Sequence, residues 1–208
     1  MAQLQGLFTV PVLTEKWTYD YQKELEFIKS VPKQNSNNQY KRRLSDDTYI
    51  LNRPELSLLH SFIKTNLDGY IKNVYDSDTK LFVTQSWINV CCKDGFHPMH
   101  HHPNSIISGV WYPDIQPGHS PIWFHKVTGT SIALNTNSIN GFNAESYQAN
   151  ISSGDLILFP STTWHSVPHN NSDSERISLS FNTWTVDDLG TEGSLTHCSI
   201  NKNNSLGS

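Results

Sequence analysis

Histidines crowd one short segment of this chain. Within the stretch DGFHPMHHHPNSIISGVWYP, four of the six positions from 97 to 102 are imidazoles. Neutral imidazole is the commonest protein ligand for iron, zinc, copper and nickel. Successive side chains of an extended segment point to opposite faces, so His100 and His102 would share one face and His101 would lie on the other. The pair predicts a metal site that takes two ligands from one strand edge.

A third histidine lies further along the chain, where a strand could face the first two. His165 lies in GDLILFPSTTWHSV, and the segment RISLSFN begins eleven residues later with Arg176-x-Ser178. A third imidazole from a facing strand would clasp the same ion and leave coordination positions open for other ligands. The order of these pieces indicates a metal centre at which His100, His102 and His165 converge.

The second part of the chain supplies the strands that must position these residues. From about residue 82, short runs of β-branched and aromatic residues are separated by Gly, Pro and Asn, a pattern that predicts strands. We identify eight such runs: TQSWINVCC, SIISGVWYP, PIWFHKV, TSIALN, AESYQANI, DLILFP, HSVPH and RISLSFNTWTV. Many short strands without intervening helical periodicity favour a mainly β fold, an antiparallel sandwich or a jelly roll.

The last of these runs shows the clearest alternation. Its polar and apolar residues occupy opposite faces: Arg176, Ser178, Ser180 and Asn182 on one, and Ile177, Leu179 and Phe181 on the other. In a one-sided sheet the polar face normally meets solvent. In a jelly roll with a ligand-holding lumen, the same face would point inward.

Helical periodicity is confined to the first third of the chain. Apolar residues recur at three- and four-residue steps in one segment that follows Pro54, and less regularly in an earlier one: Leu56, Leu59, Ile63, Leu67, Tyr70 and Val74, and Tyr21, Leu25 and Ile28. The polar segment KQNSNNQYKRRLSDD between them predicts a loop or a mobile segment. We expect the N-terminal helices to pack on one outer face of the β-structure.

One domain is expected, because 208 residues suit a single compact core. It should span residues 1–188, with a helical part over about 1–80 and the jelly-roll core over about 82–188. The stretch 189–208 has no periodicity and predicts a disordered tail.

Composition limits the expected partners. The formal net charge is −4, 16% of residues are charged, and no run of Lys or Arg stands out, so neither nucleic acid nor membrane is expected as a partner. A small-molecule or peptidyl substrate fits better. The three cysteines form neither a disulfide framework nor a zinc motif. Without a recognisable secretory leader or a membrane-spanning stretch, the sequence predicts a cytoplasmic protein.

The segment from about residue 85 to 184 resembles the 2-oxoglutarate- and Fe(II)-dependent oxygenases, and within them a subgroup of uncharacterised members. The resemblance lies in five ordered motifs: H-x-H-P, S-G-V-x-Y, F-P-S, H-x-V and R-I-S-x-S-F-N, which occur here in HHHPNSIISGVWY, GDLILFPSTTWHSVPHN and RISLSFN. That superfamily folds as a double-stranded β-helix, which is a jelly roll, and holds a metal with an H-x-D/E…H triad. The resemblance implies that His100 and His165 are its first and last ligands.

His102 departs from the family pattern, because it stands where the superfamily usually has Asp or Glu. Two other choices of third ligand remain open. A triad begun at His102 would place the amide of Asn104 at the carboxylate position, and Asp94 would have to swing in from the preceding turn. Halogenase-like relatives leave this position to a small residue and bind halide there, so a bulky histidine disfavours halogenation.

The resemblance also implies the cofactors and the reaction. Fe(II), 2-oxoglutarate as co-substrate and O2 would be needed, with succinate and CO2 released as a second substrate is oxidised, usually by hydroxylation. Dianionic 2-oxoglutarate could neutralise a ferrous ion held by three neutral ligands. Arg176, with Ser178, would grip the distal carboxylate, which a guanidinium can bind bidentately and an ammonium cannot.

Two rival interpretations remain. A cupin-type metal protein without 2-oxoglutarate would share the fold, but its expected glutamate is absent, because Ile106 and Ile107 occupy that position, and it leaves Arg176 without a role. A non-catalytic β-sandwich binding protein would hold zinc or no metal and would not respond to 2-oxoglutarate.

Overall fold

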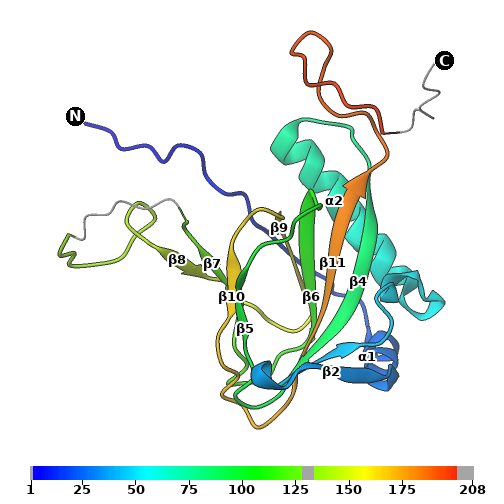
Figure 1. Ribbon diagram of the computed structural model, residues 1–208. Coiled ribbons are helices and arrows are strands. Elements are labelled where there is room, and N and C mark those ends of the chain that lie inside the picture. Colours follow the sequence, from blue (N-terminus) through cyan, green and yellow to red (C-terminus); the bar gives the residue numbers. More distant parts are fainter. Residues whose placement is uncertain (1, 128–133, 201–208) are drawn as a thin grey trace.

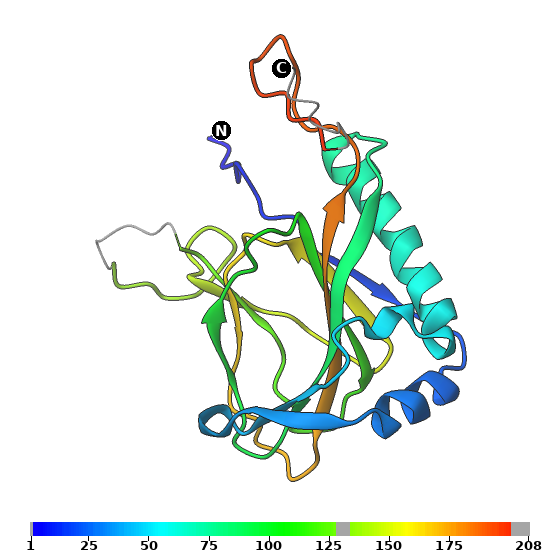
Figure 2. The same cartoon turned by 45° about the vertical axis from the view of Figure 1, so that its right-hand side comes forward.

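Two antiparallel β-sheets form the body of the protein in the computed structural model, which describes residues 2–127 and 134–200 (Figure 1). The larger sheet has seven strands in the order β1-β9-β6-β11-β4-β3-β2, and the smaller has four in the order β5-β10-β7-β8. The two sheets face each other across the middle of the molecule (Figure 2). The structure confirms the prediction of a mainly β, jelly-roll fold.

The strands of the larger sheet, in spatial order, are β1 (Leu13–Lys16), β9 (Asp155–Pro160), β6 (Ile107–Asp114), β11 (Arg176–Thr185), β4 (Leu81–Cys91), β3 (Arg42–Ser45) and β2 (Lys33–Asn37). Those of the smaller sheet are β5 (His97–His100), β10 (His165–Val167), β7 (Trp123–His125) and β8 (Ser146–Gln148). Three 3₁₀ turns are η1 (Asn38–Tyr40), η2 (Ile50–Asn52) and η3 (Pro54–Leu56).

Two helices, α1 (Gln22–Ser30) and α2 (Ser57–Tyr75), lie on the outer side of the larger sheet (Figure 2). α2 follows the 3₁₀ turn that Pro54 opens, and it ends at Asp76, whose φ of 47° is left-handed. The apolar stripe of α2 is buried against the sheet: Leu59, Ile63, Leu67, Tyr70 and Ile71. This burial confirms the predicted position of the helices. No helix in the described ranges is both long and apolar enough to span a membrane.

β11 separates the core under the helices from the space between the sheets. One face joins the helix-side core through Ile177, Leu179 and Phe181. The other face lines a pocket between the two sheets through Arg176, Ser178 and Ser180. The polar face of this strand therefore points inward, as the jelly-roll alternative predicts.

Gly109 of β6 marks a close approach within the larger sheet. It pairs with Phe181 of β11, and a Cβ placed on it would lie 2.2 Å from the Phe181 ring and 2.8 Å from Leu158. The missing side chain leaves room for a buried aromatic ring. This packing gives the S-G-V motif a physical reason.

The predicted loop at 33–47 is wrong, because this segment contains β2 and β3. The two strands pair with each other, and β3 then pairs with β4. Backbone hydrogen bonds at the sheet edge hold this hairpin. Its mostly polar residues therefore do not show the alternation of apolar side chains that predicts a strand. β1 and β5 were also not among the eight predicted strands, and most of TSIALN lies outside the described residues.

The predicted tail begins at residue 189. Leu189 and Cys198 exchange backbone hydrogen bonds of 2.9 and 2.7 Å, which close a loop. Residues 201–208 lie outside the described part of the chain, so the domain limits stay a prediction.

Candidate metal centre

Two histidines are brought together by the pairing of β5 with β10. In the register of these antiparallel strands, His165 lies directly opposite His100. Side chains at opposed positions of an antiparallel pair share a face, so both rings point the same way. Their ring centroids are 4.2 Å apart, and His165 is only 5% exposed.

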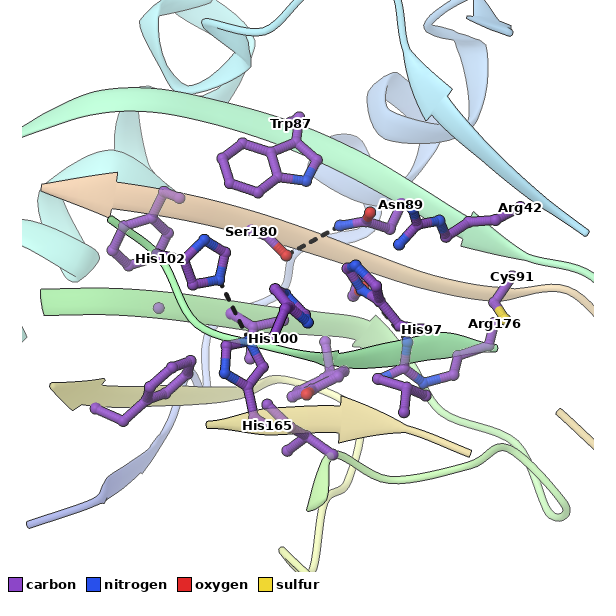
Figure 3. Close-up of a pocket in the computed structure, with 18 residues that line it drawn as sticks. Arg42, Trp87, Asn89, Cys91, His97, His100, His102, His165, Arg176 and Ser180 are labelled. Carbon is purple, nitrogen blue, oxygen red and sulfur yellow. Dashed lines mark hydrogen bonds between the residues drawn. The ribbon is translucent and has the colours of Figure 1, made fainter. Parts of the chain in front are cut away.

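The third histidine follows the end of β5. The His102 backbone N–H donates to the Ser161 carbonyl at 2.9 Å, which ties this segment to the turn before β10. The His102 Nε2 atom lies 3.2 Å from Nε2 of His165 (Figure 3). Together with His100, these residues offer ring nitrogens that all lie within 4.8 Å of one another. In the described chain they are the one group of three or more His, Cys, Asp or Glu residues with this geometry.

Backbone hydrogen bonds orient two of the rings. Nδ1 of His100 lies 2.8 Å from the Pro98 carbonyl oxygen, and Nδ1 of His165 lies 2.9 Å from that of Thr163. A carbonyl can only accept, so Nδ1 carries the proton in each case, and the Nε2 lone pair of the neutral ring is free for a metal. Such outer hydrogen bonds commonly fix the tautomer of metal-binding histidines.

The cluster is electrically neutral at physiological pH. Burial, and then the neighbouring His100, lower the pKa of His165 to about 3 and that of His102 to about 4. Burial also lowers the pKa of His100. Neutral imidazoles are the form that binds metal. Two nitrogens each about 2.1 Å from a shared ion, at a right angle, would be about 3 Å apart, close to the separation of the His102 and His165 nitrogens.

Acid should destabilise the metal-free protein. The unfolded histidines take up protons below the ordinary pKa of about 6.5, whereas His165 and His102 resist protonation in the fold until about pH 3 and 4. Stability is therefore fully present above pH 6.5 and falls as the pH drops toward 4, by up to about 1.4 kcal/mol per pH unit for each histidine. Denaturant unfolding of the metal-free protein between pH 7.5 and 4.5 measures this slope. His165→Gln should flatten it, and an equal slope in that variant would contradict the assignment.

Arg176 lies in the same pocket as the histidines. It is 3% exposed, and its Nη1 lies 3.5 Å from Oγ of Ser178. Its guanidinium stacks over the Tyr112 ring at 5.1 Å from the centroid. The Nε atom is buried without a hydrogen-bond partner, and among the described residues no carboxylate pairs with this side chain. A buried guanidinium without a carboxylate partner favours the binding of an anionic ligand, because an uncompensated buried charge destabilises the protein.

Besides the three histidines, Arg176 and Ser178, the pocket lining includes six residues from β3, β4, β5 and β6: Arg42, Trp87, Asn89, Cys91, His97 and Tyr112. Among these six, the sequence suggests a lumen-facing position only for Asn89, a polar residue in an otherwise strand-like segment, and the other five were missed. His97 stacks on His100 with a centroid separation of 4.1 Å, and burial lowers its pKa to about 2. Asn89 donates to Oγ of Ser180 at 3.0 Å (Figure 3). The i, i+2 spacing of residues 87, 89 and 91 is the signal that places these side chains on the lumen face.

The alternative third ligands lie elsewhere. Asp94 is exposed, and its carboxylate accepts from Lys41 Nζ at 3.0 Å. Asn104 is exposed in a turn, with φ of 54°. His101 packs edge-on against Trp164 at 4.7 Å and does not line the pocket. Of the candidates weighed from the sequence, His102 is the one that lies beside His100 and His165.

Comparison with known proteins gives one family match and several similar folds. Residues 85–182 match a family model described as "Putative 2OG-Fe(II) oxygenase". No curated protein matches the chain by sequence.

Three solved structures illustrate the likeness of fold. HygX from Streptomyces hygroscopicus, solved with nickel, 2-oxoglutarate and hygromycin B bound, has a TM-score of 0.62 at 13% identity, covering 85% of this chain and 84% of that one. The α-ketoglutarate-dependent epimerase SnoN from nogalamycin biosynthesis has a TM-score of 0.63 at 12% identity, with coverage of 95% and 84%. A Pseudomonas putida prolyl-4-hydroxylase has 0.55 at 13% identity, with coverage of 85% and 94%.

Proposed function

We propose that this protein is an Fe(II)- and 2-oxoglutarate-dependent oxygenase whose metal is held by His100, His102 and His165. The family match over residues 85–182 and the structural neighbours indicate an oxygenase of this class. The observation that carries the proposal is one pocket that contains both a three-histidine cluster and a buried arginine without a carboxylate partner among the described residues.

The three histidines fit a divalent metal. They are neutral and close together, and Nδ1–H of His100 and of His165 donates to a backbone carbonyl, which leaves Nε2 of each ring as the atom able to bind a metal. Three protein ligands on one side leave the other positions of a six-coordinate ion open. Fe(II), when bound, supplies the redox chemistry that couples decarboxylation of 2-oxoglutarate to oxidation of a second substrate.

The other end of the pocket fits the distal carboxylate of 2-oxoglutarate. The Arg176 guanidinium can donate two parallel hydrogen bonds to that group. Burial raises the pKa of Tyr112 to about 12, so this phenol stays protonated and can act as a donor. Apolar side chains that include Val110 and Phe159 line the same space and limit the entry of water, which strengthens these charged contacts.

The reaction we propose is hydroxylation of a small-molecule or peptidyl substrate. A hydroxylase and an epimerase both occur among the structural neighbours, so the fold accommodates more than one oxidative outcome. The histidine at position 102 supports an oxygenase rather than a halogenase, because as a metal ligand its ring would occupy the coordination position that halide would need. We also propose a cytoplasmic location, since all three cysteines are free thiols, as a reducing compartment favours.

Anaerobic ligand addition tests the function directly. Fe(II) and then 2-oxoglutarate are added to the metal-free protein, and the visible spectrum is recorded. We expect a metal-to-ligand charge-transfer band that appears only when both are present, because the keto acid must chelate the iron to produce it. Iron that binds without producing this band at saturating 2-oxoglutarate would instead support the cupin or the non-catalytic interpretation.

A further inference from the structure

Two arginines lie in one row across the larger sheet. In the pairing of β3 with β4, Arg42 lies opposite Cys91, and in the pairing of β4 with β11, Cys91 lies opposite Arg176. Residues in register across neighbouring strands point to the same face, and the strands are about 4.8 Å apart. The Cα atoms of the two arginines are therefore about 10 Å apart, with one short side chain between them.

All three members of this row face the pocket. Arg42, Cys91 and Arg176 are pocket-lining residues, and Figure 3 shows them at one end of it, on the far side of His97 from His102 and His165. The positive charges of both arginines act on the Cys91 thiol and lower its pKa, although burial raises it overall. The strand register and the pocket lining place both arginines beside this cysteine.

The lining of the pocket is cationic. Its described lining residues include these two arginines and no Asp or Glu. A carboxylate has two oxygens and about four lone-pair sites, so it can accept hydrogen bonds from two guanidinium groups at once. In this row only the short side chain of Cys91 separates the two arginines.

We propose that Arg42 is a second arginine that binds the distal carboxylate of 2-oxoglutarate, which lies between Arg42 and Arg176 above the Cys91 thiol. This inference rests on the proposed function. A primary substrate must be oxidised next to the metal, whereas Arg42 lies with Arg176 at the opposite end of the pocket. Arg42 thus selects the co-substrate, together with Arg176, and does not bind the primary substrate.

A pair of neighbouring arginines provides the test. Arg42→Gln removes the charge from the pocket, and Arg43→Gln is its matched control, because Arg43 pairs with Val90 on the opposite face and forms an ion pair with Glu175. Each full-length variant is loaded with Fe(II) without oxygen and titrated with 2-oxoglutarate and with 2-oxopentanoate, in which a methyl group replaces the distal carboxylate. Calorimetry gives the dissociation constants without requiring turnover.

Arg42→Gln should weaken 2-oxoglutarate binding roughly tenfold to hundredfold, the usual effect of losing a charged hydrogen bond, and should leave 2-oxopentanoate binding unchanged. Arg43→Gln should change neither. Arg42→Lys keeps the charge but not the planar fork and should give an intermediate loss of 2-oxoglutarate affinity. This second variant keeps the test valid if Arg42→Gln fails to fold. Parental 2-oxoglutarate affinity in Arg42→Gln, or equal weakening of both ligands, would overturn this inference alone. Failure of the parent protein to bind 2-oxoglutarate would overturn the proposed function as well.

Discussion

Arg176→Ala should weaken 2-oxoglutarate binding by about 100-fold or more and leave Fe(II) binding nearly unchanged. Arg176 is buried beside Ser178 and Tyr112, so its removal would leave the distal carboxylate in a water-poor space without its charged partner. Leaving one member of a buried charge pair alone costs about 2–5 kcal/mol. Anaerobic titration of the Fe(II)-loaded variant, followed by the charge-transfer band or by calorimetry, measures the loss.

Two further variants separate this role from a general effect on folding. Arg176→Lys keeps a cation but loses the bidentate fork, and it should fall between the parent and the alanine variant. Arg53→Ala removes an exposed arginine that pairs with Asp47 outside the pocket, and it should bind 2-oxoglutarate as the parent does. Parental affinity in Arg176→Ala would show that the carboxylate is bound elsewhere.

The sequence predicted the parts of the fold that bury a periodic apolar face. α2 could be predicted because its apolar residues recur at helical spacing, as packing on the sheet requires. β9 was predicted with the bounds Asp155–Pro160 because nearly all of its residues are apolar. The β2–β3 hairpin was missed for the opposite reason. Backbone pairing at a sheet edge holds it, and such pairing leaves no apolar period in the sequence.

The candidate site likewise contains residues that the sequence predicts and residues that it does not. Ligand spacing and strand alternation placed His100, His102 and His165 together, and the structure brings their rings into one cluster. The contribution of Arg42 depends on which residue of β3 lies opposite Cys91. Long-range register of this kind is set by pairing between distant segments, so a single sequence carries little information about it. His97 was missed because a stacked imidazole looks, in sequence, like any other histidine near a turn.

Alanine substitutions across residues 100–102 should separate the two faces of the segment. His100→Ala and His102→Ala should each lose most of their Fe(II) affinity and all turnover of 2-oxoglutarate, because each removes one of three ligands. His101→Ala should keep both properties, since this ring packs on Trp164 and does not line the pocket. Metal content after dialysis against Fe(II), and succinate formation, measure the two effects. An inactive His101→Ala together with a fully active His102→Ala would reverse the faces and exclude the proposed triad.

His102→Asp is the sharper version of this test, because it introduces the carboxylate that usually stands at this position in the oxygenase superfamily that the sequence resembles. An aspartate offers an anionic oxygen ligand, and its negative charge would compensate part of the positive charge of a ferrous ion. The parent site offers three neutral imidazole rings and no such compensation. We expect the variant to bind Fe(II), unlike His102→Ala, and to retain altered but measurable turnover of 2-oxoglutarate. Fe(II) dissociation constants for the parent, the aspartate variant and the alanine variant, measured side by side, give the comparison. If the aspartate and alanine variants lose iron equally, residue 102 does not reach the metal, and the third ligand must come from another part of the pocket.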